Sequence, residues 1–297
     1  MQSAKCKRGR GLFAFGILHL ALRCFVASDV RPAAVAGSWY PASADRLRRD
    51  VDGYIASATM DTVPAPIAIV APHAGLKYSG PVAAFAYKAA SQARYSAAVL
   101  VGPSHFVGFS GVSIWARGAW ETPLGPVHVA EELAERIASL SPEVIEHRDA
   151  HGREHSLEMQ LPFVAHLLRG VPIVPMVMGY QRRETAFGIG DALARAVGRD
   201  HVLVVASSDL SHFHDAAAAE AMDSIVLGHV ERLDAEGLMQ ALEREPHHAC
   251  GGGPMVAAMH AARQLGAMRA RVLKYADSGD ISGDKSSVVG YMAAAIW

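Results

Sequence analysis

The sequence predicts a single α/β domain in which a mainly parallel or mixed central sheet is flanked by helices on both faces. Short apolar runs alternate along the chain with amphipathic segments of about 10 to 17 residues, the pattern typical of βαβ units. The 297 residues are 51% hydrophobic and 19% charged, a composition that suits a protein with a large core. No internal repeat, low-complexity segment or linker divides the chain, so we expect one domain over 30–297.

Six apolar runs rich in β-branched residues are the predicted strands of this sheet. The runs at 67–71, 97–101 and 202–206 are short and continuous, as expected of strands that are buried on both faces. A β-rich excursion with alternating residues and a turn containing proline and glycine is expected over 106–128. The six strands are predicted at 67–71, 97–101, 172–178, 202–206, 271–276 and 287–295.

The intervening segments are predicted to be helices. Ser43 is expected to cap the first of them, because apolar residues follow it at helical spacing as far as Ala58. Pro162 is expected to kink a helix at 153–169. The other helices are predicted at 81–92, 130–140, 182–197, 215–231, 234–244 and 254–266.

Residues 1–29 form an N-terminal extension that differs in character from the rest of the chain. Basic residues precede an apolar stretch at 12–22, a pattern that resembles a signal peptide, but 25–27 is a poor cleavage site. The alternative is a misassigned start with translation beginning near Val30, which we favour because the body lacks the features of secreted proteins. Cys250 is the only cysteine after residue 29, so an internal disulfide framework is excluded there. A cytoplasmic protein is therefore expected.

Composition also argues against several classes of function. The formal net charge of −1 and the lack of a basic stripe argue against nucleic-acid binding. No run in the body reaches the roughly 18 apolar residues of a membrane span. The glycines at 251–253 stand outside any known phosphate-binding motif, so no nucleotide cofactor is predicted.

Two histidines follow predicted buried strands. His73 comes shortly after 67–71 and His105 shortly after 97–101, each beside Gly or Pro residues that suit tight turns. Open α/β sheets bind ligands outside the carboxyl ends of their strands, and imidazole is a common ligand of zinc, iron and copper. The two side chains are thus candidates for one metal site. The alternative is that each histidine only satisfies a buried carbonyl.

Asp209 and His212 follow the strand at 202–206 and reach the same edge of the sheet. The carboxylate could bind a metal, or it could orient an imidazole that does. The alternative is that Asp209 or Ser211 caps a helix that opens near His214, and that histidine would then face solvent.

Cys250 precedes a glycine-rich turn and a predicted helix. A cysteine before a helix N-terminus is expected to have a lowered pKa, and its thiolate could be a nucleophile or a soft metal ligand. The alternative is a small buried residue in a tight turn. Glu154 and Glu158 are spaced four residues apart on one face of the predicted helix at 153–169, where spacing alone favours a solvated pair.

Together these motifs resemble the Memo family, whose bacterial members are often called AmmeMemoRadiSam system protein B. The resemblance covers residues 30–297, and it is specific because several separate motifs occur in the right order. It also supports a true start near Val30. The motifs are Arg31-Pro32 with Ala36-Gly37-Ser38-Trp39-Tyr40-Pro41, Ala71-Pro72-His73-Ala74-Gly75, Gly102-Pro103-Ser104-His105, Glu154-His155-Ser156-Leu157-Glu158-Met159-Gln160-Leu161-Pro162, Ser207-Ser208-Asp209-Leu210-Ser211-His212, Ala249-Cys250-Gly251 with Pro254, and a terminal strand at 286–295.

The resemblance implies the fold of class III extradiol dioxygenases, non-haem iron enzymes that hold Fe(II) with two histidines and one carboxylate. In the Memo family a cysteine takes the third place, which implies His73, His105 and Cys250 as metal ligands. Asp209 and His212 would line the same pocket as a catalytic pair that handles protons. A thiolate favours copper or redox-active iron, with zinc as a further option, and ring cleavage is not carried over. The remaining implied pocket residues are Ser104, Glu154, His155, Glu158 and Gly251.

These observations lead to three hypotheses. The first is a metal-dependent, dioxygenase-like oxidoreductase that acts on a small molecule or a protein not identified by the sequence. The second is a binding or adaptor module, or one that delivers metal, since eukaryotic Memo proteins are implicated in binding phosphotyrosine peptides. No arginine cluster stands beside the motifs, which weakens an anion site. The third is a zinc-dependent hydrolase that uses His73, His105 and Asp209 while Cys250 is a bystander.

Overall fold

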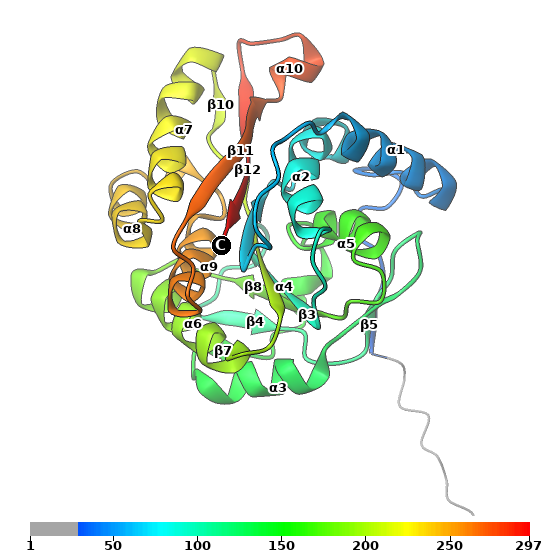
Figure 1. Cartoon of the computed structure of the whole chain (residues 1–297), viewed down its shortest axis with the longest axis vertical. Helices are drawn as coiled ribbons and strands as arrows, with labels where there is room; N and C mark the ends of the chain where they lie inside the picture. The colour runs from blue at the N-terminus through cyan, green and yellow to red at the C-terminus, as the bar shows by residue number, and fades with distance from the viewer. Residues whose placement is uncertain (1–28) are drawn as a thin grey trace, which may run out of the picture.

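A nine-stranded mixed sheet forms the centre of the protein in the computed structural model, which describes residues 29–297 (Figure 1). Its strands are β2 (Ala68–Ala71), β3 (Ala97–Pro103), β4 (Val112–Ile114), β7 (Val144–Ile145), β8 (Ile173–Met178), β9 (Val202–Ser207), β10 (His212–His214), β11 (Ala270–Asp277) and β12 (Val288–Ile296). They lie in the order β10-β12-β2-β9-β3-β8-β4-β7, with β11 paired to β12. The neighbours β2, β9, β3 and β8 are parallel, whereas β12 and β4 join them antiparallel. The predicted mixed sheet is confirmed.

The predicted β-rich excursion is also present. Besides β4, it contributes β5 (Ala119–Trp120) and β6 (Val127–His128), which form a small separate sheet with β1 (Val30–Arg31). The pairing of β1 with β5 is parallel, so the start of the described chain is joined to a segment about ninety residues further along.

Helices cover both faces of the central sheet, as predicted. In one group, α1 (Ala44–Ser57) and α5 (Leu161–Leu167) pack with α2 (Leu76–Ala90), which lies on β2 and β12 (Figure 1). In the other, α9 (Gly252–Gln264) packs on β2, β3 and β9 and contacts α6 (Arg183–Val197) and α8 (Ala235–Arg244). The remaining helices are α3 (Glu131–Leu140), α4 (Asp149–Gly152), α7 (Ala216–Glu231), α10 (Gly279–Ser282) and the 3₁₀ turns η1 (Glu158–Gln160) and η2 (Pro246–His248).

Three predicted helices need correction. The segment at 153–169 is not one helix, because 153–157 is irregular, η1 follows, and Pro162 stands in the first turn of α5. The second helix begins at Leu76 and not at Pro81, which lies inside it. Asp215, and neither Asp209 nor Ser211, caps α7 by accepting the N–H groups of its first turn, and His214 belongs to β10.

The parallel strands bring three predicted site segments to one edge of the sheet. Ala71 pairs with Ser207 at the end of β2 and β9, and Val101 pairs with Ala206 near the end of β3. The loops that carry His73, His105 and Asp209 therefore leave the sheet at the same level. Among residues 29–297, no helix is long and apolar enough to cross a membrane. The predicted extension lies almost wholly outside the described residues, with only Asp29 inside them.

Candidate metal centre

His73 leaves β2 through Pro72 and is almost fully buried, with 1% of its surface exposed. Its backbone N–H donates to Asp209 Oδ1 (2.7 Å), and its ring Nδ1 lies 2.8 Å from Ser207 Oγ. That hydroxyl already donates its single proton to the Ser156 carbonyl (2.6 Å) and accepts from Gln160 Nε2 (2.8 Å). Ser207 can therefore only accept from His73, so the proton of the neutral ring is on Nδ1 and Nε2 carries a free lone pair. Burial keeps the ring neutral, since it lowers the pKa of His73 well below its usual value.

His105 follows β3, and its ring is oriented in the same way as that of His73, but by a different partner. Its Nδ1 lies 2.9 Å from Glu154 Oε1, and its backbone N–H donates to Glu154 Oε2 (2.6 Å). Burial alone would raise the pKa of Glu154, but hydrogen bonds from His105 and Ser156 outweigh it and lower that pKa to about 2. The ionised carboxylate can only accept, so His105 donates from Nδ1 and leaves Nε2 free for a ligand.

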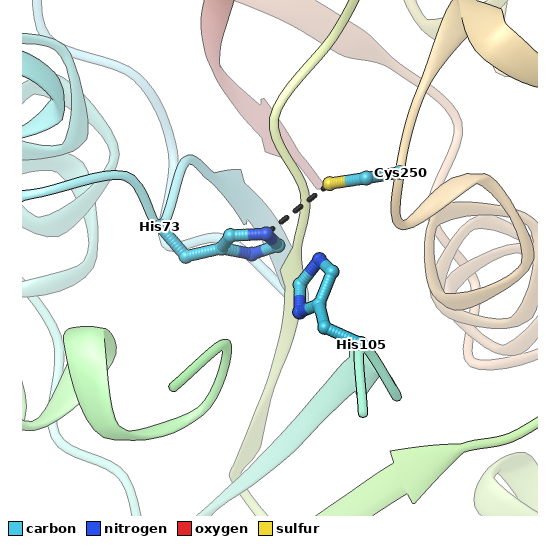
Figure 2. Close-up of side chains that lie close together, drawn as sticks. All are labelled: His73, His105 and Cys250. Atoms are coloured by element: carbon cyan, nitrogen blue, oxygen red, sulfur yellow. Dashed lines mark hydrogen bonds between the residues drawn. The ribbon is translucent and has the colours of Figure 1, made fainter. Parts of the chain in front are cut away.

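Cys250 faces the two free nitrogens from the opposite side, just before α9 (Figure 2). Its Sγ lies 3.1 Å from His73 Nε2 and accepts the backbone N–H of Asp209 at 3.3 Å. The next residue must be glycine, because a Cβ at Gly251 would overlap the carbonyl oxygen of Ser207 at the end of β9. This close approach brings α9, and with it the thiol, against the strand that orients His73.

The prediction that Cys250 is a thiolate is wrong for the protein without a bound metal. Burial raises the pKa of the thiol above its usual value, and the nearby Asp209 carboxylate raises it further. These effects outweigh the helix N-terminus on which the prediction depended. The proton of the thiol is therefore available for a hydrogen bond to His73 Nε2, and a metal ion would have to displace it.

Asp209 fixes the backbone of the loop that carries His73. Its Oδ1 accepts the backbone N–H groups of both His73 (2.7 Å) and Ala74 (3.3 Å). The ligand atoms of His73, His105 and Cys250 lie within 4.8 Å of one another, and no Asp209 oxygen belongs to that group. His212 begins β10 and lines a cavity that also reaches Cys250.

His155 lines the site beside both histidines. Its ring stacks on His105 (centroids 4.6 Å apart) and contacts Trp39 (4.2 Å). Burial and the imidazoles of His73 and His105 lower the pKa of His155 to about 4, so the ring is neutral. A second cluster of His105, Glu154 and His155 is as compact as the first. Its carboxylate, however, already accepts four N–H bonds, so Glu154 serves to orient His105.

Glu158 is fully buried and is not one of the possible metal ligands. It is the anchor of the segment at 31–41, which we call the N-terminal strap and which carries Trp39 to the ring of His155. The four donors to Glu158 are Arg31 Nη1 (2.7 Å), Ala34 N (2.8 Å), Val35 N (2.9 Å) and Tyr40 Oη (2.8 Å).

Ser104, another predicted pocket residue, bonds to the backbone of its own loop: its hydroxyl donates to the Val107 carbonyl (2.7 Å).

Three residues of the site were not predicted from the sequence. Ser207 and Gln160 fix the tautomer of His73, and Trp39 covers His155. All three occur within the motifs that carry the Memo resemblance, which is the one signal that could have selected them. Chemistry alone could not, because serine, glutamine and tryptophan are not typical metal ligands.

Glu154→Gln is expected to lower metal affinity by about 10- to 100-fold, the usual effect of losing an outer partner of a ligating histidine. The amide would place an N–H group against one of the N–H donors of His105, His155 or Ser156. The His105 ring would then no longer be held as the tautomer whose proton is on Nδ1. Metal titration of the purified variant measures the change. The matched control is Asp191→Asn, which removes a carboxylate from His260 (2.8 Å), a pair that belongs to neither group of possible metal ligands. Equal affinity of a folded Glu154→Gln protein would contradict the assigned role.

Comparison with known proteins identifies relatives of this chain. Residues 31–295 match the model of a family described as Memo-like protein. A MEMO1 family protein from Methanothermobacter thermautotrophicus is 39% identical over 273 residues, covering 88% of this chain and 98% of its own length. Another, from Thermotoga petrophila, is 36% identical over 279 residues, covering 90% and 99%. The crystal structure of an uncharacterized Escherichia coli K12 protein matches with a TM-score of 0.53 at 17% identity, over 76% of this chain and 98% of that one, which is a similarity of fold alone.

Proposed function

This chain belongs to the Memo family, and from that premise we propose that it is a redox protein whose iron or copper ion is held by His73, His105 and Cys250. The observation that carries the proposal is the orientation of the two imidazoles. Both use Nδ1 for a hydrogen bond inside the protein, and both direct a free Nε2 toward the same thiol. Fixed outer partners of this kind are typical of histidines that bind metals.

The donor set suits iron or copper. Two imidazole nitrogens and one sulfur are ligands that both metals accept, and an ion held by these three residues would be able to bind a reactant as well. Such an ion supplies one-electron chemistry toward oxygen or a bound molecule. A zinc hydrolase built on His73, His105 and Asp209 is less well supported, because Asp209 Oδ1 accepts from the backbone of the His73 loop and no Asp209 oxygen belongs to the compact group of ligand atoms.

Asp209 and His212 are the groups that we propose to move protons. Burial raises the pKa of Asp209 and lowers the pKa of His212, so the two values approach one another. A smaller difference between the two pKa values lowers the free-energy cost of moving a proton between such groups or to a bound molecule. The pair lies beside Cys250, since the backbone N–H of Asp209 donates to Sγ and His212 lines the adjoining cavity.

Elemental analysis of protein purified without oxygen, with the thiol protected, tests the metal. We expect about one equivalent of iron or copper per chain. Oxygen consumption with a reductant then separates the enzyme from an adaptor: turnover by the metal-loaded protein supports the redox function, and capture of a partner without turnover supports the adaptor. Protein that takes up neither metal under these conditions would overturn the proposal.

Metal uptake is expected to release one proton per ion between pH 7.5 and 8.5. The proton comes from Cys250, whose pKa is raised by burial, whereas His73 is already neutral because burial lowers its pKa. The apparent affinity should therefore rise by about tenfold per pH unit. Calorimetric titration in buffers of different ionisation enthalpy measures the released protons. A release of none, or of two or more, would contradict this assignment of protons.

A further inference from the structure

Phe213 has an exposed ring and an unfavourable backbone conformation at once. Its side chain is 78% exposed, and its φ is 63°, in the left-handed region that favours glycine and asparagine. An exposed ring gains nothing from burial, and a left-handed backbone is costly for a residue with a Cβ. Neither property stabilises the fold. Residues held in such conformations cluster at functional sites.

A β-bulge fixes the position of Phe213. His212 pairs with Val289 and His214 pairs with the preceding residue, Val288, so Phe213 is the extra residue of β10. The register is secured before the bulge by the Gly290 N–H, which donates to the Ser211 carbonyl (2.9 Å). Bulges beside active sites re-aim a side chain, and this one places an exposed phenyl ring in the lining of a cavity.

That cavity has a volume of about 600 Å³ and extends to Cys250. Its size matches sites for small organic molecules and is too small for a folded partner. Leu210, Phe213, Met222 and Pro246 form the apolar part of its lining, and the rest of the lining is His212, His214, Glu245, His247 and Cys250. Arg182 and Arg183 line a different cavity of about 590 Å³, which shares Pro246 and Cys250 with this one.

We propose that the Phe213 cavity is an apolar subsite, which binds the hydrocarbon or aromatic portion of a small-molecule substrate. The reacting polar group of that molecule would then lie at Cys250, the one of the three candidate ligands that lines this cavity. This inference rests on the proposed function for the identity of the reacting end. Phe213 is the residue that determines specificity for the apolar portion, and its exposed ring is the face that the substrate would cover.

The test uses 1-naphthol, two fused rings with one hydroxyl group, as the probe. Phe213→Gly and Phe213→Asn both remove the ring and both suit a left-handed backbone. We expect each variant to bind 1-naphthol about tenfold more weakly than the wild type, with a melting temperature equal to or above that of the wild type. Met268→Asn is the matched control, since Met268 is 80% exposed, lies in the α9–β11 turn and is not one of the residues that line the cavity.

Two results would overturn the subsite. One is a wild-type affinity for 1-naphthol weaker than about 1 mM. The other is an affinity that is unchanged in both Phe213 variants, and a lowered melting temperature in these variants would then assign Phe213 a structural role. Titration of metal-free protein keeps this test independent of the metal. Iron and copper content is measured separately in the wild type, so loss of the proposed function and loss of the subsite are told apart.

Discussion

Cys250→Ser is expected to weaken the binding of iron or copper by more than the roughly 100-fold that loss of an outer partner can cause. Serine is close to cysteine in size, so the tight packing of Gly251 against β9 should be preserved. Its hydroxyl, however, keeps its proton at neutral pH and is a harder donor than sulfur. Anaerobic metal titration and elemental analysis measure the loss, and thermal unfolding checks that the variant is folded.

Two further variants make this result specific. His73→Ala removes a second ligand and should cause a comparable loss of metal. His260→Ala removes an imidazole that binds Asp191 at the surface and should leave metal content unchanged. If Cys250→Ser and His73→Ala both keep the metal content of the wild type, then His73, His105 and Cys250 do not form the metal site.

The architecture of the sheet could be predicted because its central strands, β2, β3, β8 and β9, are buried on both faces. Runs such as 202–206 contain only apolar residues, and this pattern requires no knowledge of partners. The helix predicted at 153–169 failed for a local reason. The Glu154 carboxylate accepts the N–H groups of His155 and Ser156, and this bonding competes with a helical turn. Periodicity of apolar residues does not record that competition.

Some features of the candidate site could likewise be predicted from the sequence, and others could not. His73 and His105 could be placed together because parallel strands end at one edge of the sheet. The protonation of Cys250 could not be predicted, because its pKa depends on the atoms that bury the thiol and on Asp209, which is 41 residues away. Glu154 and Glu158 share a spacing typical of one helix face, yet one orients His105 and the other anchors the N-terminal strap. Sequence spacing is informative only where the secondary structure is as predicted.

Glu158→Gln is expected to destabilise the protein by about 3–5 kcal/mol. The glutamine keeps the shape of the side chain but leaves the guanidinium of Arg31 buried without a counter-charge. Arg31 cannot escape to solvent, because it also donates to the His151 carbonyl (2.8 Å) and stacks on Trp120 (4.1 Å). Chemical denaturation measures the free energy of unfolding.

The control for this prediction is an exposed pair of the same residue types. Glu243→Gln breaks the bond of Arg183 to Glu243 (2.8 Å) at the surface, where we expect a cost below about 1 kcal/mol. Combining Glu158→Gln with Arg31→Met removes the unpaired charge and should restore part of the lost stability. A double variant no more stable than Glu158→Gln alone would show that the backbone and tyrosine bonds of Glu158 dominate. In that case the N-terminal strap, and the contact of Trp39 with His155, would depend on hydrogen bonding and not on the buried ion pair.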